Sequence, residues 1–453
     1  MVAIPVLVVL PQNPDLRESA DSAAIAMATG QPSTTGTSPE AAGQLPDSIV
    51  LDTSFAAVPM GLGAPTPESF QATTAREDSE FLVRGVIDSE DLPRFAEFEA
   101  GQPKVFVDAQ IGAMPICPGD PALGNAADVR SLLNVSELTR RGLTGDGVAV
   151  AIVDSGINLN HLQKRGVPAR LDPHIFWTPT PNVPPGEYPV DHGTMCAYCA
   201  LISAPNATLL DFPLLQSTRR GGSAMDGVLS DAITAFNVML NMMLKPEDER
   251  PYQSLVVNNS WGMFHQSWDF PAGHPGRYAD NPNHPFNLIV SSLAQAGADI
   301  LFAAGNCGSD CPDGRCQGVS TNVITGANSH PDVLSLAGVD ISRTRVGYSS
   351  QGPGNANLHA LKPDVAAYTH FNGSNAYGVG SPDGGTSTAC PVAAGCLASL
   401  RTRTPPSQLS PSALADAVRD TAVKPNGSTG HDNDIGFGII NPIGVADGLV
   451  PSV

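Results

Sequence analysis

The chain has 453 residues, 42% of them apolar, which is enough for one large domain with its own core and a smaller second unit. Charged residues make up only 15%, and 45 glycines and 41 prolines predict many turns and loops, so an α/β or β-rich fold is favoured. The balance of 24 basic against 44 acidic residues gives a net charge of −20, which repels phosphate backbones and anionic lipid surfaces. We therefore expect no nucleic-acid partner and no membrane partner.

Residues 1–116 form the first predicted unit, a small α+β domain. Its first apolar run has no Lys or Arg before it and no small-residue cleavage site at the right distance, so we interpret it as a strand rather than a signal peptide. The predicted order is β, α, β, β, α, β, with a flexible Gly/Ser/Thr/Pro stretch after the first helix, and it matches the split βαβ arrangement of ferredoxin-like domains. The predicted elements are strand 2–10, helix 19–28, strands 48–58 and 80–87, helix 88–100 and strand 104–112.

Residues 117–126 are a predicted linker, and residues 127–453 are the second predicted domain. Strands alternate with helices there, which predicts an α/β fold with a mostly parallel central sheet covered on both faces. The apolar strand 148–154 ends in Asp154, as expected of a central strand with a functional carboxylate at its carboxyl end. The other predicted elements are helices 129–142, 191–203, 228–244, 286–298 and 411–422, strands 208–215, 254–262, 299–306, 332–340 and 362–368, and a turn with an edge strand at 436–441.

Eight cysteines are present, and none has the paired spacing of a zinc ribbon. Cys196 and Cys199 stand three apart on one predicted buried helix, where cysteine commonly acts as a small apolar side chain. This usage suits a reducing compartment, so a cytoplasmic location is favoured, with secretion as the alternative. Cys307, Cys311 and Cys316 lie in a polar loop, and we expect plain loop thiols there rather than one disulfide or half of a metal site.

The segment GGTSTACPVAAGCLASL (384–400) predicts a tight loop feeding a mostly buried helix. The first turn of this helix carries Ser387. Pro391 is also predicted to lie in the first turn, where its missing N–H breaks no helix bond. Taken alone, a serine in this position is more often a helix cap than a nucleophile.

Three polar residues stand at the ends of predicted core elements. Asp154 ends a strand, and His192 and Ser387 each begin a helix. A serine hydroxyl is a poor nucleophile until a neighbouring imidazole accepts its proton, and the imidazole needs a buried carboxylate to fix its tautomer and stabilise its charged form. If the fold brings the three together, the pattern predicts acyl transfer.

The blocks around these residues are VDSGINLNH (153–161), DHGTMCA (191–197) and GGTSTACP (384–391). They resemble the Asp, His and Ser blocks of the subtilisin-like serine peptidases, the subtilases, and occur in that family's order. The resemblance covers about residues 127–447. It implies a subtilisin-like three-layer fold and a serine endopeptidase, with Ser387 as nucleophile, His192 as general base and then acid, and Asp154 as orienting carboxylate. We interpret Asp191 as a helix N-cap.

The resemblance also implies an oxyanion hole and a cleft for peptide or protein substrates. Asn306, which closes LFAAGN, would donate its side-chain amide to the oxyanion beside the Ser387 backbone N–H. Substrates in this family bind as an added strand, with the 216–227 loop alongside as a second edge. Nothing in the sequence forms an acidic pocket, so specificity stays open. The implied walls of the primary specificity pocket are Ser260, Trp261, Gly262, Ala303, Ala304 and Gly305, and for Trp261 an ordinary core position is the alternative.

Two further features come from the resemblance. Cys196 stands one turn after His192, where proteinase K-like subtilases also carry a cysteine. Residues 1–116 resemble the inhibitory propeptide that many subtilases carry, which implies that the chain blocks its own cleft and cuts itself near 113–130. We expect a monomer that requires no cofactor; subtilases often use calcium to pin loops, but no Asp/Asn-rich loop here specifies a site.

Two rival interpretations follow from the same residues. An α/β-hydrolase esterase would need G-x-S-x-G and the order Ser, Asp, His, whereas Ala389 replaces the last glycine and only a short tail follows Ser387. A catalytically silent subtilase fold that acts as a peptide-binding module is the alternative function, because a permanently blocked cleft leaves no trace in the sequence.

Overall fold

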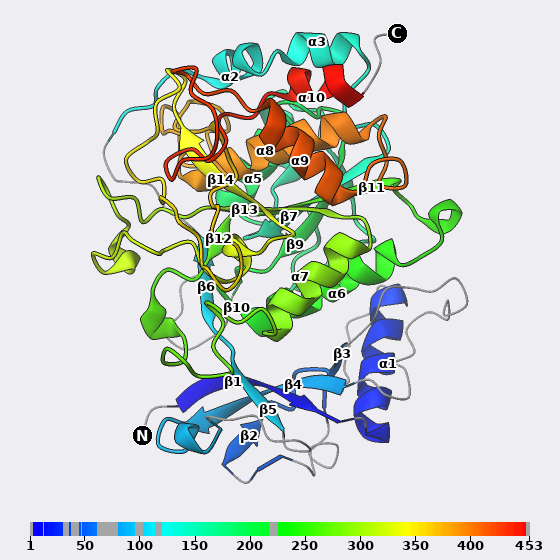
Figure 1. Cartoon of the computed structure of the whole chain (residues 1–453). Coiled ribbons are helices and arrows are strands. Elements are labelled where there is room, and N and C mark those ends of the chain that lie inside the picture. Colours follow the sequence, from blue (N-terminus) through cyan, green and yellow to red (C-terminus); the bar gives the residue numbers. More distant parts are fainter. Residues whose placement is uncertain are drawn as a thin grey trace.

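The computed structural model describes residues 3–11, 13–29, 36–37, 45–46, 48–60, 80–95, 103–113, 120–180, 182–216 and 225–449 (Figure 1). None of the described helices is long and apolar enough to cross a bilayer. The strands are β1 Ala3–Leu10, β2 Ile49–Leu51, β3 Val58–Met60, β4 Glu80–Asp88, β5 Lys104–Val107, β6 Gln110–Ala113, β7 Val148–Asp154, β8 Arg170–Asp172, β9 Thr208–Pro213, β10 Asp226–Val228, β11 Ser254–Asn259, β12 Trp261–Gly262, β13 Asp299–Ala303, β14 Leu334–Val339 and β15 Val365–Tyr368. The helices are α1 Pro14–Thr29, α2 Ala126–Leu132, α3 Val135–Arg140, α4 Leu159–Lys164, α5 His192–Ala200, α6 Leu229–Met243, α7 Pro285–Gln295, α8 Thr386–Arg401, α9 Pro411–Thr421 and α10 Pro442–Leu449.

The N-terminal unit is an antiparallel sheet in the order β2-β4-β1-β5, with β3 also paired to β4. The predicted small N-terminal α+β unit is therefore present, with an antiparallel sheet. The predicted strand 48–58 is wrong in detail, because it divides into β2 and β3. The predicted helix 88–100 is reduced to a 3₁₀ turn, Leu92–Phe95, with 96–100 outside the described residues, as is most of the Gly/Ser/Thr/Pro stretch.

The predicted strand 104–112 also divides, because Asp108 leaves the line of the strand. Its carboxylate accepts the Ser230 N–H and the Ser230 hydroxyl, both at 2.9 Å, at the start of α6. The chain therefore pairs with β1 as β5 and then continues as β6 into a second sheet, in the order β10-β6-β12. Figure 1 shows β6 running from the N-terminal unit into the larger domain.

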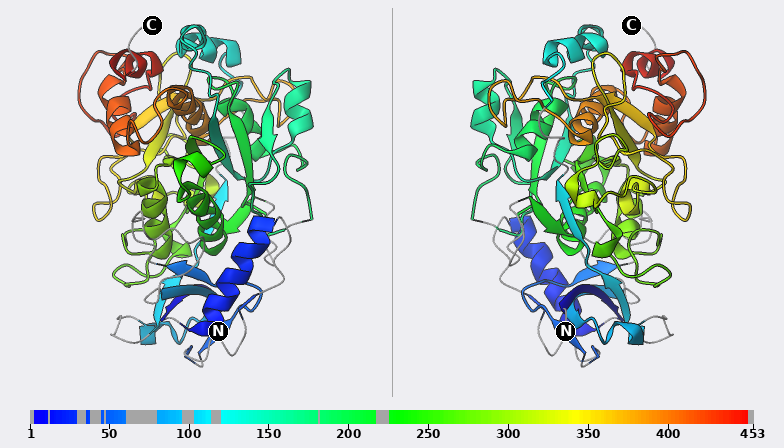
Figure 2. Two further views of the ribbon diagram at one scale, coloured as in Figure 1. Left: turned by 90° about the vertical axis from the view of Figure 1, so that its right-hand side faces the viewer. Right: turned by 90° about the vertical axis from the view of Figure 1, so that its left-hand side faces the viewer.

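The larger domain is built on a sheet whose described strands run in the order β15-β14-β13-β11-β7-β9-β8, all parallel. Every residue of β7 is buried. Alternate residues of this strand belong to different core clusters: Val150 packs on the side of α5 and α8, and Ala151 on the side of α6 and α7. Both faces of the sheet are therefore covered by helices, as is usual for parallel sheets. The predicted α/β class is confirmed. Figure 2 shows the N-terminal unit at one end of the molecule and α10 at the other.

Some elements of the larger domain differ from the prediction. The predicted helix 129–142 breaks into α2 and α3, because Asn134 adopts a left-handed conformation with φ 53°. The 436–441 segment makes isolated bridges at Ile439 in place of a strand. The short elements α4 and β8 and the terminal helix α10 were not predicted.

Helices α5 and α8 pack closely against each other. A Cβ at Gly395 would lie 2.1 Å from the Ala200 carbonyl oxygen, so α8 needs a glycine at the crossing. The start of α5 is equally tight, because a Cβ at Gly193 would lie 2.5 Å from the Gly156 carbonyl oxygen. The second approach places the first turn of α5 against the turn that follows β7.

The N-terminal unit contacts the larger domain through α6 and α7, which face it in Figure 1. Arg84 on β4 forms an ion pair with Asp231 on α6 at 3.0 Å. His284, at the start of α7, is fully buried; its Nε2 lies 3.1 Å from the Val107 carbonyl oxygen, and its Nδ1 accepts the Phe286 N–H. This pairing requires the neutral ring, and burial lowers the pKa of His284 to about 3.

We expect acid to weaken the folded chain through His284. Below pH of about 6.5 the unfolded state takes up a proton that the folded state cannot accept until pH of about 3, so this residue alone removes up to about 1.4 kcal/mol of stability per pH unit across that interval. Urea denaturation of the full-length chain at pH 7 and pH 5 measures the loss. His284→Gln keeps a donor and an acceptor without the titration, and its stability should fall less between the two pH values; equal losses would contradict the assignment.

Candidate active site

Asp154 and His192 form a buried pair at the carboxyl end of the sheet. Asp154 ends β7, His192 begins α5, and their side chains are 0% and 3% exposed. His192 Nδ1 lies 2.8 Å from Asp154 Oδ1 and 2.9 Å from Oδ2. Asp154 Oδ1 also accepts the Ser155 N–H at 2.7 Å. Asp191 is the N-cap of α5, as predicted, and accepts the His192 N–H.

Ser387 lies in the first turn of α8 and is fully buried. The helix begins after Gly385, whose φ of 75° turns the chain into it. Ser387 Oγ lies 3.4 Å from the Ser260 carbonyl oxygen. His192 Nε2, the ring atom that does not face Asp154, is buried with no hydrogen-bond partner among the described residues.

The prediction that Pro391 breaks no helix bond is wrong. Pro391 is the sixth residue of α8, beyond the first turn, and its missing N–H leaves the Ser387 carbonyl without a helical partner. The Ser260 hydroxyl fills that place, donating to the Ser387 oxygen at 3.0 Å. A side chain at the end of β11 thereby fixes the backbone of the serine.

The Cys196 thiol is where the three predicted catalytic residues converge. Its Sγ lies 3.8 Å from His192 Nδ1, 3.7 Å from Asp154 Oδ2 and 3.5 Å from the Ser387 carbonyl oxygen. Burial and then the charge of Asp154 raise the pKa of this thiol well above its usual range. Cys196 is therefore a neutral, weak donor under the pair.

Asn306 lies just beyond the end of β13 and is fully buried. Its Oδ1 accepts the Thr386 N–H at 2.9 Å and the Thr386 hydroxyl at 3.1 Å. These bonds fix the carbonyl end of the amide against the start of α8. The amide is therefore oriented by the same turn that carries Ser387.

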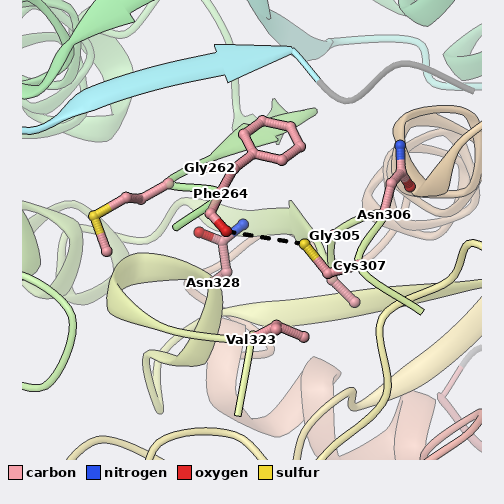
Figure 3. Close-up of a pocket in the computed structure, with 9 residues that line it drawn as sticks. Gly262, Phe264, Gly305, Asn306, Cys307, Val323 and Asn328 are labelled. Atoms are coloured by element: carbon pink, nitrogen blue, oxygen red, sulfur yellow. Dashed lines mark hydrogen bonds between the residues drawn. The ribbon is translucent and has the colours of Figure 1, made fainter. Parts of the chain in front are cut away.

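A small pocket lies beside Asn306 (Figure 3). Its volume is about 10 Å³, room for about one water molecule. The lining residues are Gly262, Met263, Phe264, Ala304, Gly305, Asn306, Cys307, Val323 and Asn328. Asn328 joins its two walls by donating to the Trp261 and Ala303 carbonyl oxygens at 3.0 and 2.8 Å.

Of the predicted pocket residues, Gly262, Ala304 and Gly305 line this pocket, and the other three do not. Ser260 binds the Ser387 carbonyl, and Ala303 contributes its backbone to Asn328. The Trp261 side chain is in the core: its Nε1 donates to the Val153 carbonyl at 3.0 Å, and its ring packs edge-on against Phe302. Sequence reasoning missed Met263, Phe264, Cys307, Val323 and Asn328, and only the adjacency of Met263 and Phe264 to Gly262 was a signal for them.

The edges of the cleft are already paired with another strand. β6 lies antiparallel between β10 and β12, with Ile111 opposite Gly227 and Ala113 opposite Trp261. β10 lies in the loop that was predicted as the second edge, of which 217–224 falls outside the described residues. The position expected for an added substrate strand is thus occupied by residues from the N-terminal part of this chain.

The expectation of plain loop thiols is wrong for Cys307 and Cys316, which form a disulfide, and Cys311 is disulfide-bonded as well. The loop folds back because the Asp313 N–H donates to the Asn306 carbonyl, which brings the two Cα atoms to 5.8 Å. Sequence spacing does not reveal such a turn. Because disulfides persist in oxidising compartments, the cysteine usage no longer favours a reducing one. Cys196, Cys199, Cys390 and Cys396 are free and buried.

The disulfide loop supports the pocket wall. Cys307 lines the pocket, and its Sγ lies 4.0 Å from the Phe264 carbonyl oxygen (Figure 3). Arg315, next to Cys316, places its guanidinium 3.6 Å from the centre of the Phe264 ring. The loop therefore clamps Phe264 from two sides.

Among the described residues, one group of three His, Cys or acidic side chains has ligand atoms within 4.8 Å of one another, and it is Asp154, His192 and Cys196. These are the paired residues and the thiol beneath them. Calcium takes six to eight oxygen ligands, so this group does not suit that ion. The absence of a required cofactor stays a prediction.

A buried carboxylate paired with a histidine beside a helix-borne serine, at the carboxyl edge of a parallel sheet, defines an α/β protein of subtilisin-like fold. A family model described as the subtilase family matches residues 145–438, more than half of the chain. The chain belongs to the subtilase family.

Individual similarities are distant. Furin from Bos taurus is 26% identical over 205 residues, covering 43% of this chain and 23% of furin. Subtilisin E from Bacillus subtilis (strain 168) is 24% identical over 287 residues, covering 61% of each chain. The crystal structure of MycP1 from Mycobacterium smegmatis matches with a TM-score of 0.48 and 19% identity, covering 76% of this chain and 90% of that one. The chain thus spans about a quarter of the length of furin.

We expect the Cys307–Cys316 crosslink to contribute about 2–3 kcal/mol to the free energy of unfolding, because it closes a loop with a separation of nine residues. Cys307→Ala/Cys316→Ala should lose that much in urea denaturation under non-reducing conditions. Cys199→Ala/Cys396→Ala removes two free buried thiols and serves as the matched control. An equal loss in both double variants would mean that packing, not the crosslink, is responsible.

Proposed function

We propose that this protein is a serine endopeptidase that hydrolyses peptide bonds through Asp154, His192 and Ser387 and an acyl-enzyme intermediate. The observation that carries the proposal is the buried Asp154–His192 pair. Its bidentate contact fixes Nδ1 as the protonated ring atom, which leaves Nε2 as the base. Convergence of both residues and the Ser387 backbone on the Cys196 thiol supports the assignment of Ser387 as the nucleophile.

In the proposed mechanism, His192 Nε2 takes the Ser387 hydroxyl proton as Oγ attacks the carbonyl carbon of the substrate. The imidazolium is stabilised by Asp154 and then returns the proton to the leaving amine. The oxyanion is bound by the Asn306 amide and the Ser387 N–H, and the positive end of α8 adds to its stabilisation. The amide is suited to this role because its Oδ1 is held by Thr386. Water then hydrolyses the acyl-enzyme by the same proton path.

The proposed substrates are peptides or proteins bound in an extended conformation between β10 and β12. The antiparallel pairing of β6 with both strands supports this mode, because it demonstrates that their edges accept a strand. The side chain before the scissile bond would lie against the wall formed by Gly262, Ala304 and Gly305. No described residue that lines the small pocket beside Asn306 is charged, which is consistent with an uncharged side chain at this position.

We further propose that the N-terminal part of the chain inhibits the enzyme and is removed by its own activity. The support is again β6, which takes the substrate edges while its unit packs on α6 and α7. The same occupation would also describe a catalytically silent, peptide-binding subtilase fold. A fluorophosphonate probe distinguishes the two, since labelling of Ser387 in folded protein, with or without residues 1–116, requires a competent triad.

We expect Ser387→Ala to lower kcat on a peptide substrate by about 10⁶-fold and Asn306→Ala by about 10²–10³-fold; both ranges derive from subtilisin, a member of this family. Ser399 is a second buried serine on α8, whose hydroxyl donates to the Ser203 carbonyl. Ser399→Ala is the matched control and should keep its activity. Comparable activity of Ser387→Ala and wild type would end the proposed mechanism.

Autoprocessing is checked by mass spectrometry of the purified protein. We expect wild type to be cut near 113–130 and Ser387→Ala to stay full length, because the proposed cut needs the nucleophile. Adding a trace of active enzyme to the Ser387→Ala protein tests whether the cut also occurs between molecules. Identical fragments in separately purified wild type and Ser387→Ala would assign the cleavage to a contaminating peptidase.

A further inference from the structure

Asp211 is a second fully buried carboxylic acid on the catalytic face of the sheet. It lies in the middle of β9, next to β7, and is paired in register with Ile152, two residues before Asp154. Because side chains alternate along a strand, Asp211 and Asp154 share one face of the sheet. The surrounding strand is apolar (TLLDFP), so a carboxylate here needs an explanation.

Its Oδ2 joins two segments that build the active site. It accepts the Gly186 N–H at 2.8 Å and the Ile157 N–H at 3.3 Å. Ile157 belongs to the turn of residues 155–158, which directly follows Asp154. Gly186 lies in the segment that leads to His192. One carboxylate oxygen of Asp211 therefore links the segment that follows Asp154 to the segment that precedes His192.

The 155–158 turn is also bound to α5. The Ser155 hydroxyl accepts the Gly193 N–H at 2.9 Å, and Thr194 Oγ1 accepts the Asn158 N–H at 3.0 Å. The 155–158 turn is therefore held on the sheet by Asp211, and it contacts α5, the helix that begins with His192. A shift of this turn moves Asp154 and His192 relative to each other.

The other oxygen of Asp211, Oδ1, is buried and has no hydrogen-bond partner among the described residues. Burial first, and the charge of Asp154 after it, raise the pKa of Asp211 to about 7, while the two backbone N–H groups act in the opposite direction. Asp211 therefore ionises in the range in which a serine peptidase gains its activity, and its charge appears as pH rises through about 7.

The charged groups near Asp211 do not stabilise its ionised form. On β7 the facing group is Asp154, which interacts with His192 of α5. Tyr188 follows Gly186 and is a neutral phenol. On β8, Arg170 pairs with Asp146 at 3.6 Å, and Asp172 accepts the Tyr252 hydroxyl at 2.7 Å. The nearby charge that acts on Asp211 is therefore the catalytic one.

We propose that Asp211 is a positioning residue for the Asp154–His192 pair, one that holds the 155–158 turn and, when ionised, adds a second negative charge on the Asp154 side of the imidazole. The proposal rests on the proposed function, since it assigns Asp211 a part in the same reaction. It makes the acid limb of the pH profile a property of two coupled groups, His192 and Asp211, rather than of His192 alone.

The test is the pH dependence of kcat/KM for wild type and Asp211→Asn, an isosteric change that keeps an acceptor for both N–H groups and removes the charge. The imidazolium then loses a negative neighbour, so we expect the acid limb to move to lower pH by about half a unit and to become steeper, because one group titrates there in place of two that oppose each other's ionisation. The plateau kcat should fall by about threefold to tenfold with KM within twofold, since positioning acts on the chemical step. A profile that superimposes on that of wild type overturns the proposal, whatever the change in kcat.

Asp269→Asn is the matched control. Asp269 is a second buried carboxylate that accepts backbone N–H groups, those of Phe270, Tyr278 and Ala279, and burial raises its pKa to about 6. Its partners lie outside the active site, so Asp269→Asn should lose stability without moving the acid limb. An equal pH shift in both variants would make the effect general and overturn the proposal.

A measurement that does not need turnover separates this inference from the proposed function. The His192 ring is titrated by NMR in the Ser387→Ala protein, where we expect two steps, and in Ser387→Ala/Asp211→Asn, where we expect one. If Asp211→Asn fails to fold, the Ser387→Ala protein still decides, because a single step there overturns the coupling. Activity retained by Ser387→Ala would contradict the proposed triad. The titration of His192 would still test the role of Asp211.

Discussion

The buried charge of Asp154 is the constraint on which the active site depends. An ionised carboxylate without solvent is tolerated only where hydrogen-bond donors surround it. Here those donors are His192 Nδ1, the Ser155 N–H and the neutral Cys196 thiol. Each donor comes from an element that must be brought to the end of β7, so satisfying one charge fixes the 155–158 turn and the first turn of α5.

Hydrogen bonds to polar side chains also fix the position of Ser387. Pro391 leaves the Ser387 carbonyl without a helical partner, and the hydroxyl of Ser260, which follows β11, binds it. Thr386, one residue earlier, binds Asn306 at the end of β13. The neighbouring parallel strands β11 and β13 are therefore each followed by a polar side chain that binds Ser387 or the residue before it. Because the carboxyl ends of parallel strands share one edge, the candidate catalytic groups meet at that edge.

Much of this arrangement was predictable from the sequence, and the exceptions have physical causes. The uniformly apolar strand ending in Asp154 and the blocks around His192 and Ser387 predicted the sheet and the convergence of the three residues. The core position of Trp261 could not be distinguished from a pocket wall, since an apolar side chain suits both. The Cys307–Cys316 disulfide depends on a single turn hydrogen bond from Asp313. Asp211 did leave a signal in the sequence, because it is an acid within an otherwise apolar strand.

β6 connects the N-terminal unit to the larger domain. Asp108 binds the start of α6, and the next residues form β6, so docking of the N-terminal unit and the pairing of β6 with β10 and β12 occur together. If β6 inhibits as proposed, it would compete with substrate as an intramolecular strand while the chain is continuous, at an effective concentration in the millimolar range for a short tether. Cleavage near 113–130 would leave the contacts of β6 in place but remove its covalent connection to the larger domain. Inhibition would then depend on the affinity of the N-terminal unit for α6 and α7, where the buried neutral ring of His284 and the Arg84–Asp231 pair lie.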